Sequence, residues 1–253
     1  MRSKSLTSLL KYNKQEETEY NNLNWTGTFS DYLKIVEKNP KTIKNAYQRL
    51  YDMVQSMGIE VFKYCKREYT KYSFFSANDR NIPIYGLEES LMQFMDILRS
   101  AAYHYGPEKR ILLFHGPVGS SKSTIVTALK QGLEKYSLTE DGALYSLSWR
   151  IEEDGEEKII PCSMNEEPLK LLPEHARDDV LKYLNSKTDD DDYLLKLDGH
   201  ISPKNEYYQQ LLLKKYDGDY TKVLDHVIIR RVVLSEKNRC GIGTFQPKDE
   251  KSQ

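Results

Sequence analysis

A glycine-bearing segment at residues 116–123, with the sequence GPVGSSKS, constrains the fold of this chain more than any other feature. A short apolar run at residues 111–114 precedes it, and an apolar helical pattern at residues 125–133 follows it. A strand, a glycine loop and a helix in this order are the setting of a phosphate-binding P-loop. The backbone N–H groups of such a loop turn inward around an anion, and the positive end of the helix dipole supports them. The segment therefore predicts a site for a nucleoside triphosphate.

Two side chains of this loop have specific chemistry. Lys122 is expected to reach the β- and γ-phosphates of ATP, and the Ser123 hydroxyl is expected to bind Mg²⁺. Ser121 stands where the usual pattern has its second glycine, so a positive φ at this residue carries a steric cost. The alternative is a Gly-Pro turn with a solvated Lys122. The predicted phosphate contacts are Gly116, Pro117, Val118, Gly119, Ser120, Ser121, Lys122, Ser123 and Thr124.

A second segment, ahead of the loop, extends the expected nucleotide site. Ile84, Tyr85 and Gly86 precede a strong helical pattern at residues 87–103. An apolar dipeptide and a glycine ahead of a helix, in this position, are similar to the start of AAA+ ATPases. That similarity makes Tyr85 and Gly86 candidate contacts of the adenine base, and the alternative is a plain turn at a helix start. The apolar face of the predicted helix holds Leu91, Phe94, Met95 and Leu98.

A P-loop ATPase also needs an acidic residue at the end of an apolar strand, where it serves Mg²⁺ and water. Residues 194–198 (LLKLD) come nearest, but Lys196 interrupts the apolar run, and residues 232–236 (VVLSE) fit as poorly. We therefore assign this role to neither Asp198 nor Glu236. Protein-kinase motifs of the H-R-D and D-F-G kind are absent from the sequence, and none of the five histidines is assigned a catalytic role.

Composition restricts the class of protein. The formal net charge is −1, which gives no global attraction to nucleic acid or to an acidic membrane surface. Three well-separated cysteines without a C-x-x-C pair argue against a zinc site and a disulfide framework. No apolar run approaches the length of a membrane span, and the first residues do not resemble a signal peptide. We expect a cytoplasmic protein with neither a nucleic-acid nor a membrane partner.

The sequence divides into three predicted parts. Residues 1–27 form a polar tail, and residues 28–75 form a small helical region with helix caps at Ser30 and Thr42. Residues 76–253 form the P-loop domain. Downstream of the loop, the patterns predict a strand at residues 143–149, a hairpin turn at Asp154 and Gly155, a helix beginning at Ser202 and Pro203, and a buried strand at residues 226–234.

Three polar segments have competing interpretations. Residues 59–81 mix basic and aromatic side chains, and we interpret them as a solvated connecting segment rather than a nucleic-acid contact. Glu166 and Glu167 could serve a metal or a partner, although such pairs more often cap a turn or face water. The acidic run at residues 189–192 lacks the spacing of an EF-hand, so we expect no Ca²⁺ site there.

Four blocks of the sequence resemble the PrkA family, whose bacterial and archaeal members are described as serine protein kinases with an N-terminal AAA-type P-loop domain. The resemblance covers most of the chain from about Thr28, and the last block is its most specific part. Family members continue past this point, so the chain resembles an N-terminal fragment of such a protein or a split gene product. The blocks are residues 85–89 (YGLEE), 113–123 (LFHGPVGSSKS), 162–169 (CSMNEEPL) and 234–253 (LSEKNRCGIGTFQPKDEKSQ).

The resemblance implies an α/β fold with a P-loop NTPase core of the AAA type, incomplete at the C-terminus, that binds ATP and Mg²⁺. It also implies phosphorylation of a protein substrate on serine, together with the missing C-terminal part, and a homo-oligomer of the AAA type. Two alternatives stay open. One is an AAA+ regulatory or motor module that drives a conformational change or an associated proteolysis, and the other is a non-catalytic nucleotide-binding interaction domain. We expect this chain alone to bind ATP but to hydrolyse it poorly.

Overall fold

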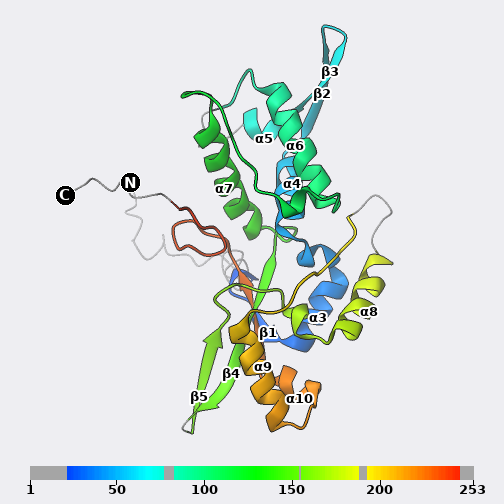
Figure 1. Cartoon of the computed structure of the whole chain (residues 1–253), viewed down its shortest axis with the longest axis vertical. Helices are drawn as coiled ribbons and strands as arrows, with labels where there is room; N and C mark the ends of the chain where they lie inside the picture. The colour runs from blue at the N-terminus through cyan, green and yellow to red at the C-terminus, as the bar shows by residue number, and fades with distance from the viewer. Residues whose placement is uncertain (1–21, 77–82, 154, 188–192, 246–253) are drawn as a thin grey trace, which may run out of the picture. The chain divides into compact units, whose positions relative to one another are not determined.

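The structure is a computed structural model of the chain (Figure 1), and it describes residues 22–76, 83–153, 155–187 and 193–245. The chain forms two compact units, each built from segments that lie apart in the sequence. The predicted acidic run and most of the predicted polar tail lie outside the described residues, and the predicted domain boundaries stay predictions. We call the units the sheet unit (residues 1–33, 145–168 and 201–232) and the helical unit (residues 34–144, 169–200 and 233–253).

A four-stranded sheet in the order β1-β6-β4-β5 organises the sheet unit. Strands β1 and β6 pair antiparallel with Thr26 opposite Arg230, and β4 and β5 pair antiparallel with Ser148 opposite Pro161. Both strands predicted downstream of the loop are confirmed. So is the hairpin, in which Gly155 has a φ of 78°. The strands are β1 (Thr26–Thr28), β4 (Leu144–Glu153), β5 (Glu156–Pro161) and β6 (Val227–Val232).

Two helices of the sheet unit follow in the chain. Helix α9 (Pro203–Lys215) begins at the predicted proline, and α10 (Tyr220–Asp225) is capped by the Asp219 side chain. The fully buried Trp149 on β4 donates from Nε1 to Asn205 Oδ1 on α9, at 3.0 Å. Because the indole N–H has this partner, the ring can be buried between sheet and helix without a desolvation penalty.

The helical unit has its core between α4, α6 and α7. The predicted apolar face of α6 is confirmed, since Leu91, Phe94, Met95 and Leu98 are all buried. A Cβ added at Gly132 of α7 would lie 2.6 Å from Met53 Sδ and 2.7 Å from Phe74 Cε2. This glycine therefore lets α7 approach α4 and α5 closely. The helices of this part of the chain are η1 (Pro40–Ile43), α4 (Ala46–Ser56), α5 (Ser73–Ser76), α6 (Glu88–Ala102), η2 (Pro107–Lys109), α7 (Lys122–Leu138), η3 (Pro168–Leu171) and α8 (Glu174–Asn185).

Both predicted caps of the N-terminal helices are wrong by a few residues. Helix α3 (Phe29–Lys38) begins before Ser30, where the Thr28 hydroxyl accepts from the backbone N–H of Asp31 at 3.2 Å. Thr42 lies inside η1, and Asn45 caps α4 instead. Asn45 and the glutamine three residues later exchange side-chain to backbone hydrogen bonds. This capping box satisfies two helix donors at once, which a lone threonine cannot do.

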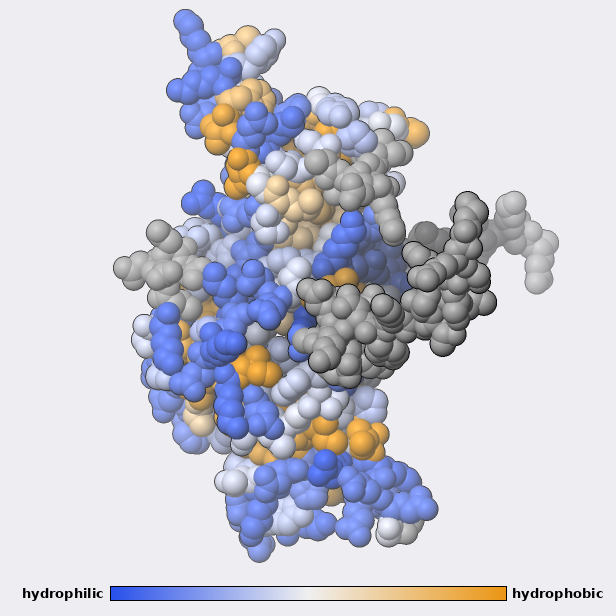
Figure 2. All heavy atoms as spheres, turned by 180° about the vertical axis from the view of Figure 1, so that it is seen from behind, coloured by the Kyte–Doolittle hydropathy of each residue, from blue (hydrophilic) through white to orange (hydrophobic). Residues whose placement is uncertain are grey.

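Over residues 59–72 a β-hairpin replaces the connecting segment predicted at residues 59–81, so that interpretation is wrong there, and residues 77–81 lie outside the described residues. Strands β2 (Ile59–Tyr64) and β3 (Arg67–Tyr72) pair antiparallel and project from the helices of their unit (Figure 1). Cys65 and Lys66 make the turn with φ angles of 48° and 66°. These residues are not a usual hairpin turn signal. Figure 2 shows hydrophilic and apolar side chains side by side on the hairpin, at the upper left.

Candidate functional site

The predicted phosphate loop lies in the helical unit and leads directly into α7. Gly119 has a φ of 83° and Ser121 a φ of 57°, so both residues adopt left-handed backbone conformations. The first hydrogen bond of the helix runs from the N–H of Ile125 to the carbonyl of Ser121, at 2.9 Å. The N–H groups of residues 122–124 therefore precede the helical ladder, and Ser121 places no side-chain cap on them. Such a helix start is suited to an anion.

Lys122 folds back onto its own loop. Its ammonium donates to the carbonyl oxygens of Gly116 at 2.8 Å and Pro117 at 2.5 Å, and to Ser120 Oγ at 3.0 Å. A Cβ at Gly116 would lie 2.9 Å from Ser120 Oγ, so glycine permits this tight closure. The loop thus places a cation inside a ring of its own acceptors, and a phosphate oxygen could replace them.

The remaining predicted phosphate contacts differ in exposure. Val118 is fully exposed, Ser123 is exposed, and Thr124 is half-buried. The Ser123 hydroxyl is therefore open to a metal ion carried by a ligand. The structure brings together Gly116, Pro117, Ser120 and Lys122 by hydrogen bonds.

The segment predicted to contact adenine is placed less clearly. Tyr85 is 70% exposed, and Gly86 has a φ of 74° with its N–H 3.4 Å from Glu88 Oε1. Ile84 is buried in the core of the unit. Among the described residues, no hydrogen bond joins Tyr85 or Gly86 to the loop. Their role in base binding stays a prediction.

The apolar run ahead of the loop differs from the predicted strand. Residues 111–114 form no strand, and they pair with no strand in the described part of the chain. Leu112 and Phe114 pack against the core, with the Phe114 ring 5.3 Å from that of Phe94. Ile111 and Leu113 point outward and are 94% and 86% exposed. The alternation is that of a strand, and only the hydrogen-bonded neighbours of a sheet are missing among the described residues.

Among the described residues, no hydrogen bond or ion pair joins either near-match to the catalytic acid to the loop. Glu236 pairs with Lys130, and this hydrogen bond lowers the pKa of the Glu236 carboxyl. Lys130 is eight residues beyond Lys122 on α7, about 12 Å along the helix axis. Asp198 is exposed. Within the described residues, no group of three or more His, Cys, Asp or Glu side chains could hold a metal ion.

The paired acids Glu166 and Glu167 have structural partners in the sheet unit. Glu166 accepts from the Ser202 backbone N–H at 2.6 Å and from the Ser202 hydroxyl at 2.8 Å, at the start of α9. Glu167 accepts from the Tyr32 hydroxyl. The capping interpretation of this pair therefore holds for Glu166, whose charge also favours a helix N-terminus.

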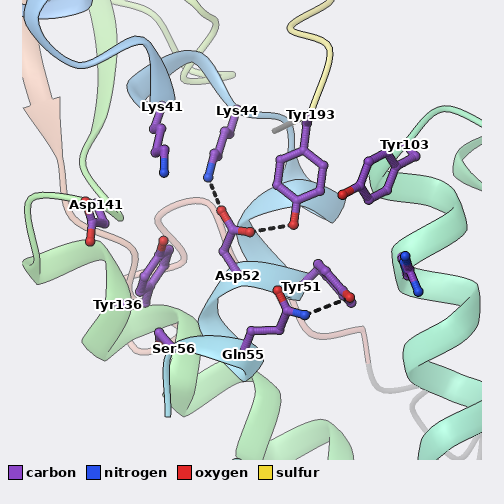
Figure 3. Close-up of a pocket in the computed structure, with 11 residues that line it drawn as sticks. Lys41, Lys44, Tyr51, Asp52, Gln55, Ser56, Tyr103, Tyr136, Asp141 and Tyr193 are labelled. Atoms are coloured by element: carbon purple, nitrogen blue, oxygen red, sulfur yellow. Dashed lines mark hydrogen bonds and ion pairs between the residues drawn. The ribbon is translucent and has the colours of Figure 1, made fainter. Parts of the chain in front are cut away.

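One feature of the helical unit has no sequence signal. A polar cavity of about 540 Å³ is lined by side chains from several segments, of which Lys41 comes first and Tyr193 last in the sequence (Figure 3). Four tyrosines line this cavity. A local pattern cannot show such a site, because its residues come from several helices and loops.

The mixed α/β elements of the chain are consistent with an AAA-type domain. The family model described as the PrkA AAA domain matches residues 27–253, and the chain belongs to this family. No helix among the described residues has both the length and the apolar character to cross a membrane.

Two curated relatives match this chain. The protein named "ATP-dependent protease PrkA" from Bacillus subtilis is 38% identical over 249 residues, which is 98% of this chain and 33% of that protein. An "Uncharacterized protein in gldA 5'region" from Geobacillus stearothermophilus is 36% identical over 104 residues, covering 41% of this chain and 97% of that protein. This chain thus spans about a third of the length of the Bacillus relative. No solved structure matches it.

Proposed function

We propose that this chain is the ATP-binding domain of a nucleotide-driven protein and that residues 116–124 hold the phosphates. The start of α7 is the observation that supports this most. There Lys122 and the three N–H groups outside the helical ladder lie on one glycine-bearing turn. The family of AAA-type domains to which the chain belongs supports ATP as the ligand.

Binding of the phosphates exchanges one set of acceptors for another. The Lys122 ammonium leaves the two loop carbonyls and the Ser120 hydroxyl and donates to phosphate oxygens instead. A hydrogen bond to a charged acceptor is stronger than one to a carbonyl, so this exchange favours the bound state. The backbone N–H groups of residues 122–124 then gain acceptors that the helix does not supply.

The donors present fit Mg²⁺ that arrives together with the nucleotide. Ser123 offers an exposed hydroxyl, whereas no carboxylate cluster is found among the described residues. Mg²⁺ is commonly bound by few protein ligands together with substrate phosphates and water. When bound, the ion neutralises charge on the phosphates. In this chain Ser123 is the residue that would hold it.

Two whole-protein activities are compatible with such a domain, and we favour ATP-dependent proteolysis. The name of the Bacillus relative states that activity for that protein, and an AAA-type motor module was one interpretation of the sequence. In this proposal ATP binding changes the conformation of a homo-oligomer in the cytoplasm that acts on a protein substrate. The second candidate is transfer of phosphate to serine of a protein, which the sequence blocks shared with the PrkA family support.

An ATP titration tests the binding proposal. Lys122→Ala is expected to weaken ATP–Mg²⁺ binding at least about tenfold, since a hydrogen bond to a charged group contributes roughly 1.5–3 kcal/mol. Lys135→Ala is the matched control, because Lys135 is an exposed lysine near the other end of the same helix. Calorimetric titration measures both affinities. Equal affinities of wild type and Lys122→Ala contradict the proposal.

Labelled ATP separates the two activities. The complete gene product is incubated with γ-labelled ATP, Mg²⁺ and casein. ATP-dependent release of casein fragments without labelled serine supports proteolysis, and label on serine supports the kinase. If ATP binds and neither product forms, the non-catalytic interaction domain replaces both candidates.

A further inference from the structure

Helix α8 of the helical unit (Figure 1) carries an arginine on its buried face. Arg177, Leu181 and Leu184 are the buried residues of this helix, and their spacing of four and three residues puts them on one side. The exposed fraction of Arg177 is only 9%. An apolar side chain is the usual occupant of such a position, because burial of a guanidinium removes a permanent charge from water.

The Arg177 guanidinium has little compensation within the protein. Its Nη1 donates to the carbonyl of Gly199 at 3.3 Å, and its Nε is buried with no hydrogen-bond partner. No ion pair joins it to a carboxylate in the described parts of the chain. A buried charge is normally paired, since an unpaired one costs far more than a hydrogen bond to a carbonyl returns. Arg177 therefore destabilises the helical unit unless an anion pairs with it.

A second cation lies at the same glycine. A Cβ added at Gly199 would be 3.8 Å from Lys170 Nζ. Lys170 is half-buried, and it also forms no ion pair with a described residue. Two positive charges thus lie around Gly199, one on η3 and one on α8. Like charges repel each other, and an anion bound to both would replace this repulsion by attraction.

The acidic residues that neighbour these cations in the sequence do not supply that anion. All four are exposed, and none forms an ion pair with Arg177 or Lys170. One of them pairs instead with Lys182, further along α8, at 3.6 Å. The four are Glu174, Asp178, Asp179 and Asp198.

Gly199 makes the two cations accessible to a ligand. It is exposed, it has a φ of 80°, and it has no side chain that could cover Arg177 or Lys170. The hydrogen bond from Arg177 to its carbonyl is longer than the usual range of roughly 2.7–3.2 Å, so an anion can readily replace it. The planar fork of arginine matches the oxygens of a phosphate or a carboxylate, and lysine adds a point charge. Two positive charges match the nearly two negative charges of a phosphate monoester better than the single charge of a carboxylate.

We infer that Arg177 and Lys170 bind a phosphoryl group beside Gly199. This site shares no residue with the loop at residues 116–124. The inference does not rest on the proposed function, because either site can bind its ligand without the other.

Calorimetric titration with inorganic phosphate at constant ionic strength tests the inference. The Lys122→Ala chain is the parent protein, so that the phosphate loop contributes little. Phosphate is expected to bind it saturably and at least tenfold more tightly than acetate does. Adding Arg177→Met is expected to weaken phosphate binding at least about tenfold, since a charged hydrogen-bond donor is lost. O-phosphoserine distinguishes the source of the group: tighter binding than phosphate identifies a phosphate ester, and equal or weaker binding identifies free phosphate.

Matched variants separate binding from a structural role. In the absence of phosphate, Arg177→Met should unfold at the same temperature or a higher one, because an apolar side chain replaces an unpaired buried charge. Lys170→Ala is the second test and should weaken phosphate binding several-fold. Lys182→Ala, an exposed lysine of α8, is the control and should bind phosphate as the parent does.

Three results would overturn the inference. The first is that phosphate does not bind saturably, and the second is that Arg177→Met or Lys182→Ala gives the opposite of the affinity expected for it. The third is that Arg177→Met unfolds at a lower temperature while Lys170→Ala keeps full affinity, which would make Arg177 a purely structural residue.

Discussion

At the scale of single residues, positive φ angles shape the candidate loop. Gly119 is the residue at which the energetic cost of such an angle can be measured separately from steric contacts. Nothing lies within 4 Å of a Cβ added at this residue, so the only penalty of Gly119→Ala is its φ of 83°. We expect this change to cost about 1–2 kcal/mol of unfolding free energy and to weaken ATP binding. Gly243→Ala is the control, because it has equal space and no positive φ. Urea unfolding measures both. Equal free energies for the two variants contradict the prediction.

At Ser121 the opposite substitution, to glycine, tests the cost of a positive φ angle. Its φ of 57° is strained for a residue with a Cβ, and Ser121→Gly removes that strain. Glycine also loses more chain entropy on folding, by roughly 0.5–1 kcal/mol, so the net change in stability is small. Binding of ATP should be at least as tight as in the wild type, which a titration measures. A tenfold loss of affinity would show that the serine hydroxyl itself contacts the nucleotide.

Sequence reasoning reached the loop residues but not their contacts. The replacement of a glycine by Ser121 pointed to a strained φ, which the structure has. The triad of acceptors around the Lys122 ammonium could not be predicted, because it depends on how the loop closes over Gly116. The assignment of these residues to ATP stays a prediction until a titration is made.

At the scale of helices, close packing of α7 against α4 and α5 contributes to the stability of the helical unit. The substitution Gly132→Ala in α7 tests this contribution. An alanine there gains up to about 1 kcal/mol of helix propensity, whereas overpacking typically costs 1–3 kcal/mol. Because the added Cβ meets Met53 and Phe74 within 3 Å, we expect overpacking to win by on the order of 1 kcal/mol. Urea unfolding measures this. The control is Thr127→Ala on the exposed side of α7, which should leave stability unchanged or higher.

Helices with a clear apolar face were predictable, and so were the apolar strands β4 and β6, whereas the exposed strands of the β2–β3 hairpin were not. The face of α6 follows directly from its helical spacing. The β2–β3 hairpin was missed, because Cys65 and Lys66 are not turn residues and most of its side chains are exposed. Residues 111–114 have the alternation of a strand, but pairing is a property of the neighbouring chain and not of the segment.

The largest gap between sequence and structure is at the scale of the whole molecule. Both compact units combine segments that lie far apart in the sequence. The side chains that line the polar cavity likewise come from positions as far apart in the sequence as Lys41 and Tyr193. No periodicity or short motif encodes such a meeting of side chains. The AAA-type class, in contrast, was predictable, because blocks of the sequence resemble a family whose N-terminal domain is of this type.

We expect slow ATP turnover by this chain. Among the described residues, no acidic cluster is present, and Glu236 is held by Lys130 more than two helical turns away from Lys122. Because no acidic group is joined to the loop among the described residues, bound ATP–Mg²⁺ should be hydrolysed slowly. We therefore expect this chain alone to bind ATP with turnover at least tenfold below that of the complete gene product, as measured by phosphate release. Glu236→Gln should leave the slow rate of the chain unchanged. Rapid turnover that Glu236→Gln abolishes would mean that this segment rearranges to reach the loop when ATP binds.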